Sequence, residues 1–211
     1  MNLPAWRPTP RTLAAAAVGI VAVVLVGGGL WFWLNARAER GQAVHAEALA
    51  QAQAARNPQA PATAKPAALT ALEAALAQAP DSALAAQTAY ELGNLRFDIG
   101  QFAPARAAYE IALARAGSRT IRTMARAGIA AAWEGERNFP KAIEAYAAAL
   151  AAEKDAPFYR EDLLIGLGRS QELAGQRDDA IKTYERVLKE VPKLRREDEV
   201  RGRLASLASG R

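Results

Sequence analysis

The chain has 211 residues, of which 51% are hydrophobic and 23% charged, so it carries enough apolar surface to fold and is not a disordered polymer. It contains no cysteine, which excludes disulfides and thiolate metal sites. The formal net charge is +5, but basic and acidic residues are interspersed, and no dense basic run with interleaved aromatics occurs. We therefore expect no binding to nucleic acid.

A membrane-spanning helix is predicted at residues 13–34, after a short N-terminal tail at residues 1–12. No charged residue lies between Arg11 and Arg37, and the segment is rich in Leu, Val and Ile. As a helix it is about 33 Å long at about 1.5 Å per residue, which matches a hydrocarbon core of about 30 Å. Trp6 lies before the segment and two more tryptophans lie near its end, as expected at the two membrane interfaces. We expect the chain to contact the lipid bilayer through this segment.

A cleaved secretory signal is the alternative interpretation. The tripeptide at 36–38, Ala-Arg-Ala, has the form of a cleavage site, but the apolar core is longer than the about 7–15 residues of a signal. The orientation rests on few charges, with Arg7 and Arg11 before the helix and Arg37 and Arg40 after it. Because the N-terminal tail is short, we expect export of the large C-terminal domain. This places it on the periplasmic side of a bacterial inner membrane.

Residues 35–65 are predicted to form a helical stalk followed by a proline-rich linker. The first part is rich in Ala, Gln and Glu, so it either continues the membrane helix or packs lightly on the domain. His45, the one histidine of the chain, has no cysteine or acidic constellation beside it, and we expect it to be solvated. Residues 57–66 contain three prolines and cannot form a continuous helix.

Beyond Pro66 the sequence is Ala-rich with helical periodicity, and no alternating strand pattern competes with it. The fold class predicted is therefore all-α. Gly, Pro, Asn and Ser interrupt the periodicity at intervals of about 15 to 20 residues, which is typical of short helices arranged as antiparallel hairpins. These breaks lie at Pro80-Asp81-Ser82, Gly100-Gln101, Gly117-Ser118, Arg137-Asn138, Ala156-Pro157, Gly175-Gln176 and Pro192.

One spacing pattern occurs three times. Each copy has a small residue on a first helix, then an alanine, a tyrosine and a small or β-branched residue on a second helix, at intervals of 12, 4 and 3 residues. The small residues let the paired helices cross closely, and the tyrosine fills the groove toward the next pair. The copies are Gly93, Ala105, Tyr109, Ala112; Ala130, Ala142, Tyr146, Ala149; and Gly168, Ala180, Tyr184, Val187. A second-helix half without a clear partner precedes them at Ala68, Leu72, Ala75 and Leu76.

These residues make the region at 66–192 resemble the tetratricopeptide-repeat superfamily. The resemblance implies a right-handed stack of helix hairpins with a concave protein-binding surface. Residues 193–211 are predicted to form a capping helix over the last repeat. The whole layout also resembles the family of the ancillary subunit of the bacterial Sec translocon, which has a single-pass anchor and an exported tetratricopeptide-like domain. That likeness rests on architecture, and it implies translocon subunits or another membrane complex as partners.

A protein-binding groove is predicted on the first helices of the hairpins, at positions spaced from Leu92, Ile129 and Leu167. The predicted groove residues are Gln87, Tyr90, Asn94, Phe97, Asp98, Met124, Ala127, Ala131, Glu134, Asp162, Ile165, Arg169 and Glu172. Asn94 matches an asparagine with which some family members bind a peptide carboxylate. Tyr90 occupies the place of the accompanying lysine, so we expect no carboxylate clamp. Tyr90 and Phe97 are candidates for binding hot spots, or else they pack against the preceding hairpin.

No catalytic motif, cofactor site or metal-ligand cluster is present in the sequence, so we expect a protein that is not an enzyme and holds no cofactor. The acidic pairs Glu161-Asp162 and Asp178-Asp179 are predicted at helix starts, where they complement the helix dipole. Three functions remain open. The chain is a scaffold for protein export or envelope assembly, an adaptor for cell-wall synthesis, outer-membrane assembly or cytochrome maturation, or an accessory subunit of a membrane enzyme complex.

Overall fold

The structure is a computed structural model that describes residues 10–152 and 157–209, apart from the side chains of residues 10–18, 21–22, 157 and 158. The described part of the chain is helical, with turns between the helices and no strand, so the all-α prediction is confirmed. The helices are α1 (Pro10–Ala55), α2 (Ala64–Gln78), α3 (Ala85–Asp98), α4 (Phe102–Arg115), α5 (Arg119–Gly135), α6 (Phe139–Ala152), α7 (Pro157–Leu173), α8 (Arg177–Glu190) and α9 (Glu197–Ala208).

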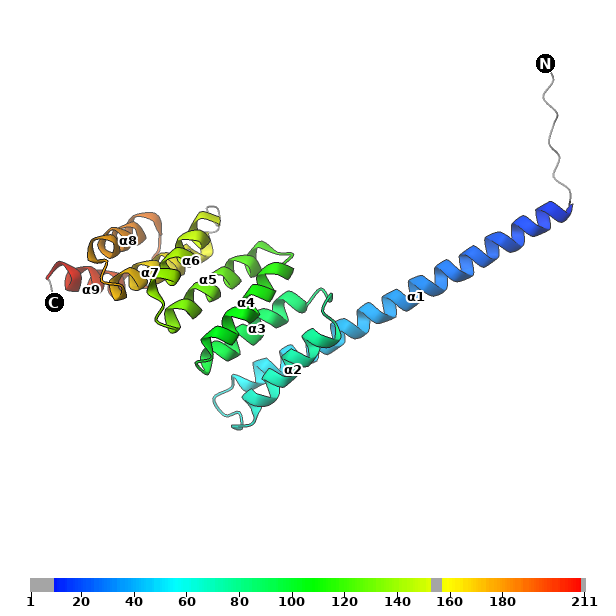
Figure 1. The fold of residues 1–211 in the computed structure, drawn as a ribbon, viewed down its shortest axis with the longest axis horizontal. Helices are drawn as coiled ribbons and strands as arrows, with labels where there is room; N and C mark the ends of the chain where they lie inside the picture. The colour runs from blue at the N-terminus through cyan, green and yellow to red at the C-terminus, as the bar shows by residue number, and fades with distance from the viewer. Residues whose placement is uncertain (1–9, 153–156, 210–211) are drawn as a thin grey trace, which may run out of the picture.

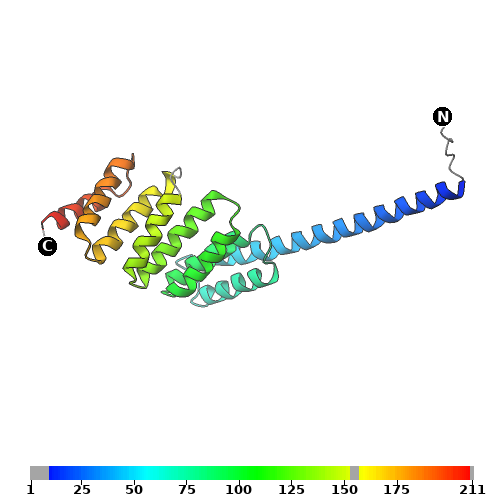
Figure 2. The same ribbon diagram turned by 45° about the horizontal axis from the view of Figure 1, so that its top comes forward.

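The helices pack in chain order, each against the next, and the first helices of successive hairpins also touch (α3 with α5, and α5 with α7). Figure 1 shows the resulting stack, with the C-terminus at one end and the long helix α1 projecting from the other. The turned view in Figure 2 separates the successive hairpins. This is the hairpin stack that the break pattern predicts.

The turns inside the three hairpins share one backbone geometry. Each turn contains a residue in the left-handed region, with φ of 75° at Gly100, 59° at Arg137 and 76° at Gly175. After each of these residues, the next amide donates to a carbonyl five residues back, as Gln101 N–H does to Arg96 at 2.8 Å. This is the Schellman end of a helix, for which glycine is best suited. Arg137 adopts the same conformation with a side chain, which costs about 1–2 kcal/mol.

Two of the repeat tyrosines, Tyr109 and Tyr146, lock neighbouring hairpins together. Tyr109, on α4, is buried, and its ring lies between Gly93 on α3 and Gly128 on α5. A Cβ added at either glycine would lie within 2.8 Å of the ring. The prediction that this tyrosine fills the groove toward the next pair is therefore confirmed. The glycine on the following helix is the part of the contact that the spacing pattern did not include.

The second copy uses the same device between hairpins, whereas the tyrosine contact of the third copy lies within one hairpin. The Tyr146 ring approaches Gly166 on α7, and the Tyr184 ring approaches Gly168 within its own hairpin. After Tyr184 the stack ends with α9, whose Val200 is buried in the same core cluster. Leu204 and Leu207 are partly buried against that cluster. The C-terminal helix α9 thus covers the last hairpin.

The C-terminal half of α1 is part of the repeat stack and not a loosely packed stalk. Ala48, Ala52 and Ala55 are buried in one cluster with Ala68 and Leu72 of α2. Alanine faces let the two helices approach closely, so they form a first hairpin joined by the loop at 56–63. This corrects two expectations. The half-repeat on α2 does have a partner, which is the C-terminal half of α1. The predicted proline-rich linker is the loop inside this hairpin, and α2 begins directly after it at Ala64.

His45 is fully buried, which corrects the prediction of a solvated side chain. Its Nε2 lies 2.9 Å from the carbonyl oxygen of Ala79, and its Nδ1 lies 2.7 Å from the hydroxyl of Thr88. Because a carbonyl only accepts, Nε2 carries the proton toward Ala79. The imidazole thereby connects α1 to the end of α2 and to α3. It supplies polar contacts in a core that is otherwise made largely of alanine.

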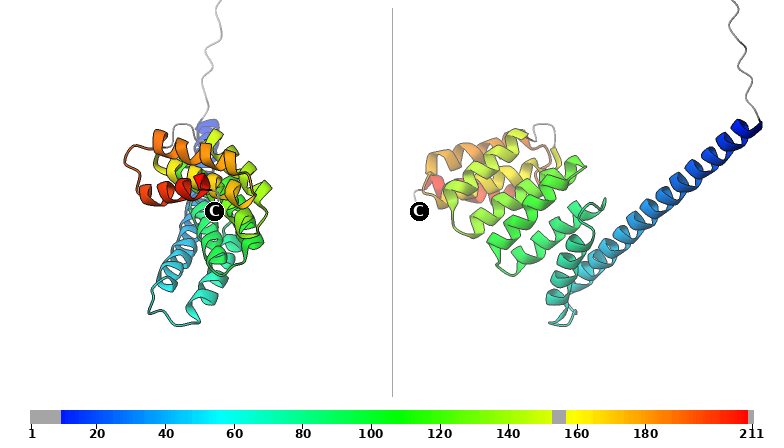
Figure 3. Two further views of the ribbon diagram at one scale, coloured as in Figure 1. Left: turned by 90° about the vertical axis from the view of Figure 1, so that its left-hand side faces the viewer. Right: turned by 45° about the vertical axis from the view of Figure 1, so that its right-hand side comes forward.

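The N-terminal half of α1 carries exposed large apolar side chains, of which Trp33 and Leu34 border a pocket beside the end of α2 and the loop after it. Ile20 and the large apolar side chains from Val23 to Leu34 are 51% to 72% exposed, and Figure 3 shows this part of the helix projecting away from the stack. Among the described residues, no helix is long and apolar enough to qualify as a membrane span. The predicted tail at 1–12 lies largely outside the described residues, as do several side chains of the predicted span at 13–34.

Candidate protein-binding groove

A pocket of about 510 Å³ lies along the first helices of the last three hairpins. Its apolar part comes from Met124, Ala127 and Ala131 of α5, and tyrosine side chains surround this part. Its charged part comes from α7 and from the loop between α8 and α9. The lining residues are Tyr90, Met124, Ala127, Gly128, Ala131, Tyr146, Tyr159, Asp162, Gly166, Arg169, Arg195 and Arg196.

A second pocket, of about 410 Å³, lies toward the C-terminal ends of the same helices. Phe97 and Phe102 give it an aromatic wall, in which the two rings meet edge to face at 5.2 Å. It shares Ala131 and Arg169 with the first pocket. The two pockets are therefore neighbouring parts of one open groove, which we call the α3–α5–α7 groove. The remaining residues that line the second pocket are Asp98, Gly100, Glu134 and Gly135.

Most of the predicted groove residues line these two pockets. They are Tyr90, Phe97, Asp98, Met124, Ala127, Ala131, Glu134, Asp162 and Arg169. Their place in the structure is thus the one expected from helical spacing, and their role in binding stays a prediction.

The other four predicted groove residues lie elsewhere. Ile165 is fully buried in the core cluster that also contains Val200 of α9, so its placement on the groove surface was wrong. Asn94 accepts a hydrogen bond from the Tyr109 hydroxyl at 2.9 Å, and Glu172 accepts one from Tyr184 at 3.1 Å. Both therefore support the repeat tyrosines. Gln87 is exposed and lines neither pocket.

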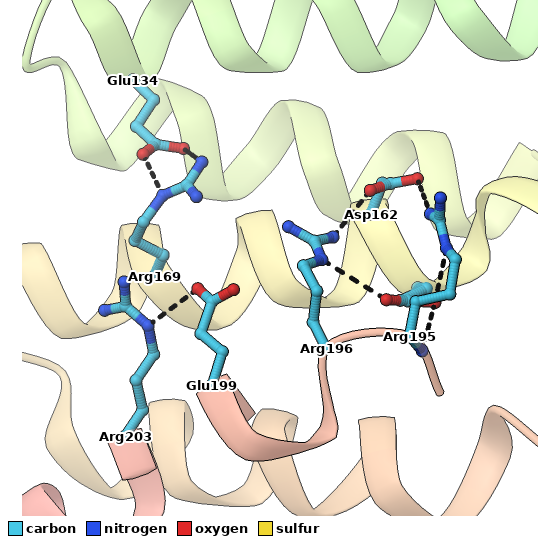
Figure 4. Close-up of polar contacts among 8 residues, drawn as sticks. Glu134, Asp162, Arg169, Arg195, Arg196, Glu199 and Arg203 are labelled. Carbon is cyan, nitrogen blue, oxygen red and sulfur yellow. Dashed lines mark hydrogen bonds and ion pairs between the residues drawn. The ribbon is translucent and has the colours of Figure 1, made fainter. Parts of the chain in front are cut away.

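Glu134 is the centre of a polar cluster that joins α5 to α7 (Figure 4). Its carboxylate accepts two hydrogen bonds from the Arg169 guanidinium, at 2.5 and 3.0 Å. It also accepts from the hydroxyls of Tyr146 at 3.2 Å and Ser170 at 3.3 Å. The hydrogen bond to Glu134 raises the pKa of Arg169, and burial raises the pKa of Tyr146. Both groups therefore stay protonated at neutral pH, and this cluster forms a fixed part of the groove wall.

The loop between α8 and α9 closes one side of the groove with two arginines, also visible in Figure 4. Arg196 donates to Asp162 at 2.6 Å and to Glu161 at 3.3 Å, and Arg195 contacts the same two carboxylates at 3.3 Å. Burial acts to raise the pKa of Glu161, but hydrogen bonds from the Arg195 backbone and from both guanidinium groups lower it. The carboxylate therefore stays ionised, and it ties the final helix to α7.

This arrangement corrects the expectation for one acidic pair. Glu161 and Asp162 lie beyond the first turn of α7, where they pair with arginines, whereas Asp178 and Asp179 do lie in the first turn of α8. Sequence reasoning also missed the two arginines as groove residues. A usable signal existed, since a pair of adjacent arginines follows a pair of adjacent carboxylates after about one repeat period.

The two aromatic candidates each contact an aromatic ring of their own hairpin. The Tyr90 ring lies 5.7 Å from that of Tyr109, and Phe97 contacts Phe102. Both rings keep part of their surface open to the groove. Burial raises the pKa of Tyr90, and the neighbouring Tyr159 raises it further. Tyr90 therefore stays neutral and offers an amphipathic ring to a ligand.

The hairpin stack, the interlocking tyrosines and the groove define a repeating helical-hairpin fold. Residues 162–193, which include the third copy of the pattern, match the Tetratricopeptide repeat family. No curated protein sequence matches the chain.

Two crystal structures of MamA are similar to this chain in fold. One has a TM-score of 0.51 and 24% sequence identity, with 60% of this chain and 68% of that chain covered. The other has a TM-score of 0.50 and 24% identity, with 59% and 63% covered. At this identity the likeness shows the fold alone. The resemblance to the ancillary Sec translocon subunit is not confirmed by these comparisons.

Proposed function

We propose that this chain is a protein-interaction scaffold that binds a partner in the α3–α5–α7 groove. The observation that carries the proposal is the open groove itself, with an apolar floor at Met124 and a wall of tyrosines beside charged side chains. Aromatic and arginine side chains in such a setting supply most of the binding energy in protein interfaces. The groove offers binding groups and no evident reaction centre, so we propose that the chain is not an enzyme and needs no cofactor.

Site-specific photocrosslinking tests this function. A photoreactive amino acid is placed at Met124 in the groove, or at Glu144 on α6, which is exposed and lines neither pocket. Cells expressing each full-length variant are irradiated, and the crosslinked proteins are identified. We expect a defined adduct from position 124 and none from position 144. The same set of adducts at both positions, or none at position 124, would contradict a groove-bound partner.

We propose further that α1 anchors the scaffold to a bacterial inner membrane through residues 13–34, with the repeat domain on the periplasmic side. The exposed apolar side chains of α1 favour this proposal, because such a continuous apolar surface requires a lipid or protein partner. A reporter that is active only in the periplasm, fused to the C-terminus, tests the orientation. Cell fractionation tests the anchor. An inactive reporter, or recovery of the chain in the soluble fraction, would contradict this part of the proposal.

The process that the scaffold serves is proposed to be protein export or envelope protein assembly. Co-purification in mild detergent distinguishes this role from the two other candidates. Translocon subunits or periplasmic chaperones would support export, cell-wall or cytochrome-maturation proteins would support an adaptor, and an oxidoreductase would support an accessory subunit. Recovery of the protein alone would contradict all three.

A further inference from the structure

The basic end of the groove has a guanidinium with spare hydrogen-bonding capacity. The Arg195 side chain is 69% exposed, and its contacts to Glu161 and Asp162 are long, at 3.3 Å each. Those contacts use Nε and Nη2, so the two Nη1 hydrogens have no acceptor among the described residues. An arginine in this state can donate hydrogen bonds to a carboxylate of a ligand and still keep its existing partners.

The opposite end of the groove carries a carboxylate in an unfavourable field. Asp98 is the last residue of α3, it lines the second pocket, and it is exposed. A negative charge at the C-terminus of a helix is repelled by the partial negative charge of the helix dipole. No basic side chain in the described part of the chain forms an ion pair with Asp98. A cation supplied by a ligand would relieve this repulsion.

Between these two ends the groove has an apolar floor, and the Glu134–Arg169 ion pair lies in its wall. Met124, Ala127 and Ala131 form its floor, and the aromatic rings of Tyr90 and Phe97 lie along α3. The line from Asp98 to Arg195 runs diagonally over the groove. It crosses two interaxial distances of about 8–10 Å each, from α3 to α7, and runs about 16 Å along the helix direction. This gives roughly 20–25 Å. An extended chain covers that distance with about six to eight residues, at about 3.3 Å per residue.

We propose that the groove recognises an extended peptide segment with charges of opposite sign at its two ends and apolar residues between them. The acidic end lies against Arg195, and the basic end lies against Asp98. The inference rests on the proposed function of the groove, and it adds the chemistry of the bound segment. Two charge pairs at opposite ends also select the direction of the segment, because the reverse placement brings like charges together at both ends.

Four synthetic peptides with the same five-residue apolar centre test the inference. Their end residues are Glu and Lys, Glu and Glu, Lys and Lys, or Gln and Gln, and binding to the full chain is measured by titration calorimetry in mild detergent. We expect the Glu and Lys peptide to bind tightest, by about two- to fivefold for each exposed pair. The preference should shrink at high salt. Equal affinity of all four peptides, or no detectable binding of the Glu and Lys peptide at millimolar concentration, would overturn the inference.

Two variants assign the pairs to the two ends. Arg195→Gln should weaken only peptides with a Glu end, and Asp98→Asn only peptides with a Lys end, each by about two- to fivefold. Asp98→Lys should make the Glu and Glu peptide the best ligand. Glu144→Gln and Lys189→Gln, on exposed positions outside both pockets, should change nothing.

Folding of each variant is checked by circular dichroism, and Arg195→Lys, which keeps the charge, should retain the preference. A uniform loss of affinity across all four peptides in Arg195→Gln would show a structural role and contradict the assignment. Failure here is distinct from failure of the proposed function. A partner crosslinked at Met124 would still establish the groove, even if its bound segment had no such charges.

Discussion

Replacing Gly166 by alanine should destabilise the protein, although alanine is the better helix former. A Cβ at this position would lie 2.4 Å from Cζ and 2.5 Å from Cε1 of Tyr146, so the ring must move. That ring is buried, and its hydroxyl donates to Glu134. Alanine gains about 1 kcal/mol of helix propensity. Overpacking costs about 1–3 kcal/mol, and the lost hydrogen bond to a charged acceptor about 1.5–3 kcal/mol.

The expected net result is a loss of about 1.5–5 kcal/mol in the free energy of unfolding. Urea unfolding of the full chain in mild detergent, followed by circular dichroism, measures it. Gly202→Ala on α9 is the matched control, because a Cβ there meets no atom within 4 Å. This control should be unchanged or more stable by up to about 1 kcal/mol.

A double-mutant cycle tests the cause. Tyr146→Leu removes the ring atoms that an alanine at position 166 would meet. The double variant Gly166→Ala/Tyr146→Leu should therefore lose less stability than the sum of the two single losses. If Gly166→Ala were as stable as Gly202→Ala, the interlock between tyrosine and glycine would not hold the hairpins together, and this reasoning would be refuted.

Four further outcomes follow from single contacts, each measured by the same unfolding assay. His45→Leu should lose about 2–4 kcal/mol, because it removes two hydrogen bonds and leaves the buried Thr88 hydroxyl without its partner, whereas a solvated histidine would lose less than about 0.5 kcal/mol. Ala48→Glu should be strongly destabilising while Ala50→Glu, exposed on the same helix, should not be. Arg137→Gly should stabilise the turn by up to about 1 kcal/mol. Because the pKa of Glu161 is lowered in the folded protein, its ionised carboxylate stabilises the fold above the unfolded pKa of about 4.3. This stabilisation is lost as the pH falls through the lower pKa of the folded state. Glu161→Gln should therefore reduce the loss of stability between pH 7 and pH 3.

The local features of the fold could be predicted from the sequence. The hairpin turns at Gly100, Arg137 and Gly175 depend on a few adjacent residues, since a helix end needs a left-handed residue and a capped carbonyl. The register of the repeats depends on contacts between a tyrosine and residues at most about one repeat away. Both kinds of signal lie within a short stretch of chain, where periodicity and spacing are readable.

The site could be predicted only in part. Helical spacing places Tyr90, Met124 and Arg169 on the groove, because the first helices of the hairpins share one orientation. The same spacing fails at Ile165. This residue occupies the repeat position that corresponds to Tyr90, but it lies in the core near the end of the stack. A periodic rule assumes that every repeat has the same neighbours, and the last one does not.

Contacts distant in sequence were decided only by the tertiary structure. His45 meets Thr88 across 43 residues, and Arg195 meets Glu161 across 34. An imidazole in this Ala-rich stretch has the same local sequence whether it faces water or the core, so its burial depends on which helix α1 packs against. By itself, the sequence determined a repeating all-α stack with an apolar segment before it. Only the packing of α1 and of the α8–α9 loop decided where that stack begins and which charges border its groove.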